Sequence, residues 1–269
     1  RLCICQIATP HRVYIFDALR SGVVDTLRPA LESPATVKVM HDCREDSSAL
    51  FSQFAVRLAH VFDTQVAHTL LLEQQRHPRP YQISLNELLK MHTLTNEKQG
   101  EMTTRMEDDA NVWFYRPLDP ELISYAAQDV MYLPLLHWLL CDKLGDPSGS
   151  QVLLQSQRYV DYADMNTHLA SPKAVEKRGL RLRAMLATKT ESSLYFKLNL
   201  GAHRQGAATR PDAVSRYDGM KCGDVAECWV SAWNTNGHVV FLERIESLSD
   251  LPVPKINTRR RRTHLRTKV

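Results

Sequence analysis

The stretch RPLDPELISYAAQDVMYLPLL at residues 116–136 decides which fold this chain adopts. Pro120 suits the first turn of a helix, and apolar residues recur after it at helical spacing. Tyr125 and Asp129 are four residues apart, so both project from one side of that helix. The pattern predicts one long helix over 120–144 that presents a phenol and a carboxylate together.

Upstream of this helix the chain alternates between strand-like and helix-like patterns, as mixed α/β domains do. Apolar and β-branched runs predict strands, and stretches with helical spacing lie between them. Ser84 stands three residues before Glu87, a capping-box pattern that predicts the start of a helix. The expected strands are 1–9, 12–17, 35–42 and 60–65, and the expected helices are 23–33, 45–54, 63–75 and 84–92.

The second half of the chain has a different pattern of apolar and polar residues. After a helical piece at 151–166, alternating apolar and polar residues predict strands at 192–201, 222–233 and 237–245. The residues Asn-Thr-Asn-Gly at 234–237 supply a hairpin turn. A small β-rich domain is therefore expected after the α/β domain.

Composition and charge limit the classes of protein to which the chain can belong. Of its 269 residues 43% are hydrophobic and 24% are charged, and no apolar run approaches the roughly 18–20 residues of a membrane helix. The six cysteines include no CxxC pair, which argues against a zinc site and favours a reducing compartment. Residues 1–170 contain 15 basic and 21 acidic residues. In contrast, residues 171–221 contain 11 basic and 4 acidic residues, and residues 255–269 contain 7 basic and no acidic residues. This distribution suggests an acidic body that holds cations and basic appendages that touch phosphates.

Four segments, taken in order, resemble the RNase D-like 3′–5′ exonucleases of the DEDDy class. LCICQIAT with YIFD is similar to the strand pair after the first motif of that family. VKVMHDCREDSSAL is similar to the second motif, with Asp46 at the carboxylate position. FDTQVAHTLL and WFYRPLDPELISYAAQDVMYLPLL resemble the segment that follows and the third motif. The match covers about 1–145 and looks closest to the metazoan branch that contains Egalitarian and the piRNA-pathway exonuclease-domain protein.

The resemblance implies a ribonuclease H-like mixed sheet flanked by helices, and a hydrolysis that uses two divalent cations, Mg²⁺ or Mn²⁺. The family uses four acids. In this chain Asp46 and Asp129 are the implied metal ligands, and Tyr125 is the residue implied to orient the attacking water. The other two acids belong to an Asp-x-Glu strand that the resemblance places before Arg1, so we expect the chain to begin inside the domain.

The residues themselves leave several alternatives open. Asp42 and Glu45 compete with Asp46 for the ligand position, and an acid in the first turn of a helix also complements the helix dipole. The Tyr-x3-Asp pair also suits an ordinary solvated helix face. Arg116 suits an ion pair within the core as well as a contact to phosphate.

The β-rich part resembles, weakly, an OB-type RNA-binding barrel over CGDVAECWVSAWNTNGHVVFLE at 222–243. Its two tryptophans are four residues apart and should share a strand face, where they stack on bases or fill the barrel. The basic segment 171–221, with KRGLRLR at 177–183, lines a nucleic-acid channel or is a solvated linker. The expected nucleic-acid-binding residues are Lys177, Arg178, Arg181, Arg183, Trp229, Trp233, Arg259, Arg260, Arg261 and Arg262.

These patterns predict an exonuclease domain at 1–147, a helical connector at 148–180, an OB-like domain at 181–250 and a basic disordered tail at 251–269. The expected function is a divalent-metal-dependent 3′–5′ exonuclease that acts on RNA rather than DNA. The alternative is an RNA-binding adaptor that keeps the fold without hydrolysis. Expected partners are RNA and proteins of an RNA-processing or RNA-transport complex, with no membrane. An intracellular location is expected, nuclear or cytoplasmic, since RRRR at 259–262 suits a nuclear signal or a phosphate-binding tail.

Overall fold

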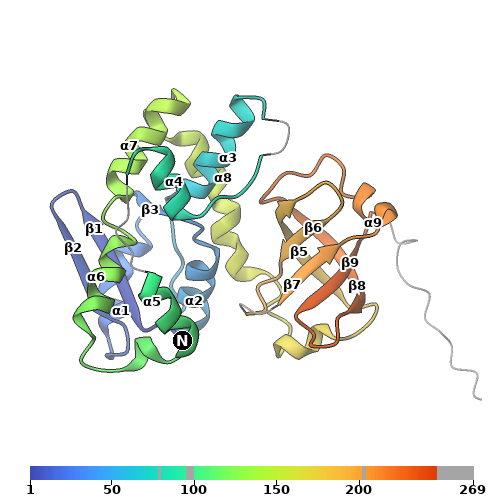
Figure 1. The fold of residues 1–269 in the computed structure, drawn as a ribbon, viewed down its shortest axis with the longest axis horizontal. Helices are drawn as coiled ribbons and strands as arrows, with labels where there is room; N and C mark the ends of the chain where they lie inside the picture. The colour runs from blue at the N-terminus through green and yellow to red at the C-terminus, as the bar shows by residue number, and fades with distance from the viewer. Residues whose placement is uncertain (78–79, 95–99, 202–203, 247–269) are drawn as a thin grey trace, which may run out of the picture.

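The structure is a computed structural model that describes residues 1–77, 80–94, 100–201 and 204–246. Figure 1 shows two parts side by side, one with helices packed around short strands and one a β-barrel. The expected basic tail at 251–269 lies outside the described residues. No helix in the described part of the chain combines the length and the apolar character needed to cross a bilayer.

Two separate pairs of strands form the sheets of the first part. β1 and β2 pair antiparallel around the short turn between them, whereas β3 and β4 pair parallel, with Val39 opposite Phe62. All four strands predicted in this part are confirmed, although β3 and β4 are shorter than the runs 35–42 and 60–65. Their bounds are Ile4–Thr9 for β1, Arg12–Asp17 for β2, Lys38–Met40 for β3 and Val61–Asp63 for β4.

Several helices of the first part begin where the sequence supplies capping residues. The Asp63 carboxylate accepts a hydrogen bond from the backbone N–H of Gln65 at 2.8 Å and caps α3. Ser84 and Glu87 form the predicted capping box of α4. The bounds are Val23–Leu31 for α1, Arg44–Phe54 for α2, Thr64–Gln74 for α3, Leu85–Met91 for α4, Gly100–Asp108 for α5 and Val112–Phe114 for the 3₁₀ helix η1.

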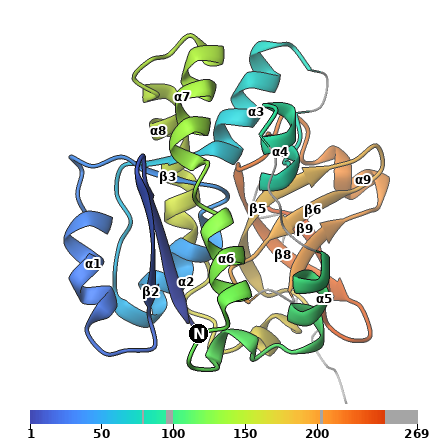
Figure 2. The ribbon, with the colours of Figure 1, turned by 60° about the vertical axis from the view of Figure 1, so that its left-hand side comes forward.

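The single helix predicted over 120–144 is wrong, because the structure has two helices there, α6 and α7. Pro134 has no N–H to donate, and its ring would clash with the carbonyl four residues earlier, so an unbroken α-helix is strongly disfavoured at this point. Asp129 keeps helical backbone angles as the C-cap of α6 and still follows Tyr125 by one turn. α6 contacts β1 and β2 (Figure 2). The bounds are Pro120–Gln128 for α6 and Leu133–Leu144 for α7.

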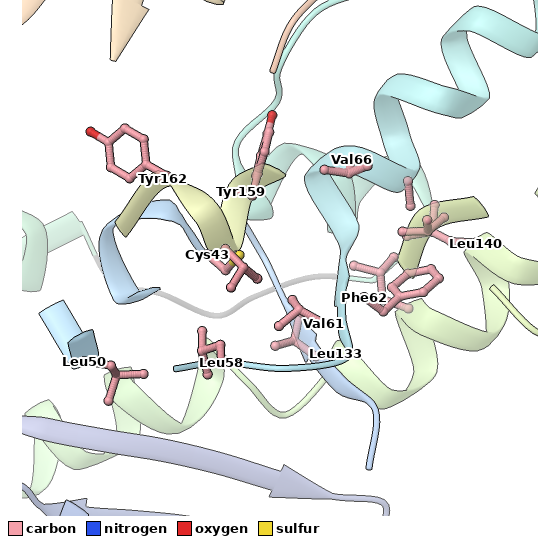
Figure 3. Packing of buried hydrophobic residues seen from close by; sticks show 14 of the residues in the cluster. Cys43, Leu50, Leu58, Val61, Phe62, Val66, Leu133, Leu140, Tyr159 and Tyr162 are labelled. Atoms are coloured by element: carbon pink, nitrogen blue, oxygen red, sulfur yellow. The ribbon is translucent and has the colours of Figure 1, made fainter. Parts of the chain in front are cut away.

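One hydrophobic core joins most elements of the first part, whereas α5, η1 and α6 contribute to a separate small cluster. Phe62 of β4 is completely buried, as is Val152 of the helix α8, which follows α7. Tyr159 and Tyr162 cover the side of this core near Cys43 (Figure 3). The predicted connector therefore begins with a helix that packs into the first part. The bounds are Ser150–Val160 for α8, Asp161–Asp164 for the 3₁₀ helix η2 and Pro172–Val175 for η3.

The second part is a closed five-stranded barrel with the strand order β5-β6-β7-β9-β8. Neighbouring strands are antiparallel except for β7 and β9, which are parallel. It is a Greek-key barrel, as in the OB-fold that the sequence suggests. The bounds are Arg181–Lys189 for β5, Leu194–Lys197 for β6, Gln205–Ala208 for β7, Pro211–Ser215 for α9, Val225–Trp233 for β8 and Val239–Arg244 for β9.

Three barrel strands, β5, β6 and β7, lie in the basic segment for which the sequence suggested a channel lining or a linker, and the sequence predicted no strand at the positions of β5 and β7. In β5 the exposed Arg181 and Arg183 alternate with the buried Leu182 and Ala184. Burial that alternates from one residue to the next is typical of a strand that packs one face on the core. The other face of β5 carries the two arginines. The interpretation of this segment as a linker is therefore wrong for β5 and β7.

A bulge in β8 also overturns the expectation that the two tryptophans share a strand face. The pairing of β8 with β9 shifts by one residue between Val230 and Ala232. Trp229 consequently lies opposite Glu243, whereas Trp233 lies opposite Val240, whose side chain is buried in the barrel. One extra residue moves all later side chains of a strand to the other face, and the sequence carried no sign of it.

Candidate active site

A cavity of about 380 Å³ lies between β1 and β3, which belong to two separate sheets. Residues 4–7 of β1 and residues 39 and 40 of β3 line it, His41 follows directly after β3, and apolar side chains of α1, α2 and α7 contribute to its walls. Two carboxylates also line it, Asp46 from α2 and Asp129 from the end of α6. The structure thus brings together two acids that are far apart in the sequence.

The loop before α2 and the first turn of this helix carry three acids, and their contacts distinguish them. The buried guanidinium of Arg44 donates to both carboxylate oxygens of Asp42, one of them at 2.8 Å. Glu45 lies 3.4 Å from the Nζ of Lys197 in the barrel. Asp46 is the one of the three that lines the cavity. These contacts favour Asp46 over its two neighbours as the candidate metal ligand.

The surroundings of Asp46 oppose its negative charge. The residue as a whole is exposed, yet loss of hydration around the carboxylate raises its pKa to about 6, with further contributions from Asp42, Asp63 and Glu45. Such a concentration of acids favours either a proton or a cation at this position.

The raised pKa of Asp46 predicts how its replacement changes stability with pH. In the unfolded chain the pKa is near 3.8, so the folded state binds the proton more tightly, and this stabilisation is lost as the pH rises through 6. Asp46→Asn cannot ionise and should stabilise the fold at pH 7.5 but not at pH 4. The pKa shift limits the gain in the free energy of unfolding at pH 7.5 to about 3 kcal/mol. Because the residue is exposed, solvent screening reduces the expected gain to about 1 kcal/mol. Thermal unfolding of both proteins at the two pH values checks this, and an equal difference at both would contradict it.

Tyr125 does not line the cavity, although it precedes Asp129 by one helical turn. Its ring lies beside that of Trp113, with 6.4 Å between the ring centroids, at the edge of a small apolar cluster that includes Leu122. The structure therefore brings Asp46 and Asp129 to one cavity and places Tyr125 outside its lining. The expected role of Tyr125 in orienting water stays a prediction.

Asp63 organises the loop that leads to α2. Its buried carboxylate caps α3 and also accepts hydrogen bonds from the backbone N–H groups of Asp42 at 3.0 Å and Cys43 at 2.7 Å. Burial raises the pKa of Asp63. The carboxylate thereby ties the end of β4 to the start of the helix that carries Asp46.

Arg116, for which the sequence left two roles open, is engaged in the first part of the fold. Its Nη2 atom lies 2.6 Å from Oδ1 of Asp17 and donates to the carbonyl oxygen of Cys3 at 3.0 Å. These contacts favour the structural ion pair over a contact to phosphate.

The predicted nucleic-acid-binding residues of the barrel lie in several places, and their role stays a prediction. Arg183 pairs with Glu227 at 3.6 Å, Arg181 lies opposite Trp229 in the β5–β8 pair, and Arg178 lines a separate pocket. Lys177 and Trp233 are exposed, and Arg259, Arg260, Arg261 and Arg262 lie outside the described residues.

The described residues supply only part of a metal site. Within the ranges that the structure covers, no group of three or more His, Cys, Asp or Glu side chains is arranged to hold a metal ion. The cavity itself offers the carboxylates of Asp46 and Asp129.

Comparison with known sequences gives this site its context. A family model described as 3′–5′ exonuclease matches residues 1–145. The piRNA biogenesis protein EXD1 of Danio rerio is 37% identical over 155 residues, which are 54% of this chain and 40% of the relative. The Egalitarian protein homolog of Caenorhabditis elegans is 32% identical over 131 residues, which are 45% of this chain and 22% of the relative. The chain thus spans less than half the length of these curated relatives.

Solved structures show the same relationship. The RNase D of Trypanosoma brucei superposes with a TM-score of 0.52 at 26% identity, over 61% of this chain and 59% of that one. Its complex with RNA U12 gives a TM-score of 0.51 at 27% identity, over 61% and 57% of the two chains. The helices and strands of the first part therefore form the ribonuclease H-like exonuclease fold that the motifs imply. The chain belongs to the RNase D-like 3′–5′ exonuclease family, which includes EXD1 and Egalitarian.

Proposed function

We propose that this protein is a nuclease that removes nucleotides from the 3′ end of RNA with the help of two divalent cations, Mg²⁺ or Mn²⁺. The observation that carries the proposal is that Asp46 and Asp129, from distant segments, line one cavity. Membership of the exonuclease family supports the reaction, and the RNA-bound Trypanosoma RNase D supports the substrate class. Protein partners from RNA processing or RNA transport belong to the same proposal.

The residues at the cavity fit hard divalent cations. Carboxylate oxygens are the ligands that Mg²⁺ and Mn²⁺ prefer. Loss of hydration, with contributions from neighbouring acids, disfavours the negative charge of Asp46, and a bound cation would stabilise that charge. When bound, two such ions supply stabilisation of the attacking and leaving oxygens of a phosphodiester.

The roles of the side chains follow from their positions. Asp46 and Asp129 would hold the cations, and the apolar walls contributed by residues such as Ile4 and Leu133 would limit the access of bulk water. The hydroxyl of Tyr125, one turn from Asp129, would accept a hydrogen bond from the attacking water and so orient it.

The alternative to this function is RNA binding without hydrolysis. An adaptor of this kind would keep the fold and use other surfaces to hold RNA.

The two functions are separated by incubating the chain with a 12-nucleotide RNA labelled at its 5′ end. The enzyme is expected to produce a ladder of products shortened from the 3′ end in Mn²⁺ and none in EDTA. Binding without any shortening in Mn²⁺ would support the adaptor and contradict the nuclease.

The role proposed for Tyr125 predicts the behaviour of Tyr125→Phe. This variant keeps the ring beside Trp113 and loses only the hydroxyl, so turnover should fall about tenfold or more with little change in thermal stability. Single-turnover hydrolysis and thermal unfolding measure the two quantities. Parallel losses of stability and activity would mark the hydroxyl as structural, whereas unchanged turnover would remove it from the mechanism.

A further inference from the structure

A second pocket, of about 450 Å³, opens on the outer face of the barrel, away from the cavity that contains Asp46. It lies over β7, β8 and β9, beside the segment that leads into α9. Its volume is within the range of about 300–1,000 Å³ that is typical of small-ligand sites.

The pocket is hollow because one aromatic ring is surrounded by small side chains. Phe241 on β9 pairs with Ala207 across the parallel ladder to β7 and with Ala232 across the antiparallel ladder to β8. Residues that pair directly in a sheet point to the same face, so both methyl groups lie beside the ring. Ala208 and Ala213 also line the pocket. The result is an aromatic side chain beside open space.

Two guanidinium groups stand at the rim of this pocket. The carboxylate of Glu243, whose side chain is only 8% exposed, pairs with Arg210 and holds it against the pocket wall. Arg178 is exposed and makes no ion pair with any residue that the structure describes. The lining therefore has one excess positive charge, and Arg178 has donors left for an anion.

A hydroxyl group in the lining has a defined hydrogen-bonding role. Ser231 Oγ donates its proton to the carbonyl oxygen of Phe241 at 3.1 Å. Its oxygen is therefore left as an acceptor at the pocket, suited to a ligand O–H such as the 2′-hydroxyl of a ribose.

We propose that this pocket binds one nucleotide of a single-stranded RNA, with the base on Phe241, a phosphate at Arg178 and the ribose near Ser231. The proposal deepens the proposed function and rests on it, since it assigns to the barrel the task of holding RNA outside the hydrolytic cavity. Base–aromatic stacking accepts any base, so the site holds the strand without reading its sequence.

The test measures binding of a fluorescent U12 RNA to the full chain in EDTA, where metal-dependent hydrolysis is absent. Phe241→Leu removes the stacking surface and should weaken binding by at least about fivefold. Arg178→Ala should weaken it by about fivefold and lower the slope of log affinity against log salt by about 0.7. Ala232→Met fills the hollow without changing charge and should also weaken binding. Thermal unfolding confirms that each variant is folded.

The matched control is Lys189→Ala, which removes an exposed charge from β5 on the same barrel, outside the pocket. It should change affinity by less than about twofold. Unchanged U12 affinity in all three pocket variants, or no binding by the unaltered chain, would overturn the proposal. Equal affinity for U12 and for the matching deoxyribose 12-mer would overturn the assignment to RNA.

These outcomes are distinct from those that test the proposed nuclease. If the pocket variants bind RNA with normal affinity and the chain shortens RNA, the proposed role of the pocket is wrong and the proposed nuclease activity stands. If the pocket variants bind RNA more weakly and the chain never shortens RNA, the proposed role of the pocket stands and the proposed nuclease activity is wrong.

Discussion

Asp129→Asn is expected to lower the rate of RNA hydrolysis by more than about 100-fold and to leave the affinity for RNA within about twofold. Asparagine keeps the size of the side chain but loses the negative charge that a cation requires from this wall of the cavity. Changes in groups that merely surround a metal ligand reduce activity about 10–100-fold, so loss of the ligand itself should exceed this. Single-turnover hydrolysis in Mn²⁺ and RNA binding in EDTA measure the two quantities.

Asp142→Asn is the matched control for this variant. Asp142 is an exposed acid on α7 that does not line the cavity, so its replacement should change neither quantity. Unchanged hydrolysis in Asp129→Asn would show that the measured nuclease activity resides elsewhere. Equal losses in the two variants would show that the effect comes from net charge and not from the cavity.

Arg44→Leu is expected to destabilise the fold by about 3–5 kcal/mol. The guanidinium is completely buried, donates to both oxygens of Asp42 and to Oε1 of Gln82, and lies with its Cζ 4.5 Å from the ring centroid of Tyr159. Leucine leaves the carboxylate of Asp42 without its main partner. The remaining cation near it, Lys197 of the barrel, is 3.6 Å away and partly exposed.

The double variant Arg44→Leu with Asp42→Asn tests whether the cost comes from the unpaired charge. Asn tolerates the left-handed backbone of residue 42, whose φ is 55°, so the second change adds little strain. We expect it to recover about 1–3 kcal/mol of the loss, measured by urea unfolding. A single variant that loses less than about 1 kcal/mol, or a double variant no more stable than the single one, would contradict this account.

Local signals in the sequence predicted the elements that depend on neighbouring residues. The capping box at Ser84 is confirmed because it needs only a residue three positions away. The Tyr-x3-Asp spacing also predicts that both residues lie on one side of α6. Apolar periodicity continues past Gln128 to Pro134 in the first turn of α7, so periodicity alone does not reveal the break between the two helices.

Features that depend on pairing between distant segments could not be predicted from one sequence. The bulge in β8 is set by its partner strand, and it separates Trp229 from Trp233. The choice among three acids near α2 is made by Arg44 and by Lys197 of the barrel, which occupy Asp42 and Glu45. The pocket around Phe241 depends on alanines from two other strands. Such contacts carry no periodic signal along the chain.

Binding of Mn²⁺ to the chain, measured by titration calorimetry or by electron paramagnetic resonance, tests most directly whether Asp46 and Asp129 form one metal site. We expect Asp46→Asn and Asp129→Asn each to weaken Mn²⁺ binding by more than about tenfold, and Asp142→Asn to leave it unchanged. Mn²⁺ affinity that is the same in the unaltered chain and in both cavity variants would contradict the metal site and, with it, the proposed reaction.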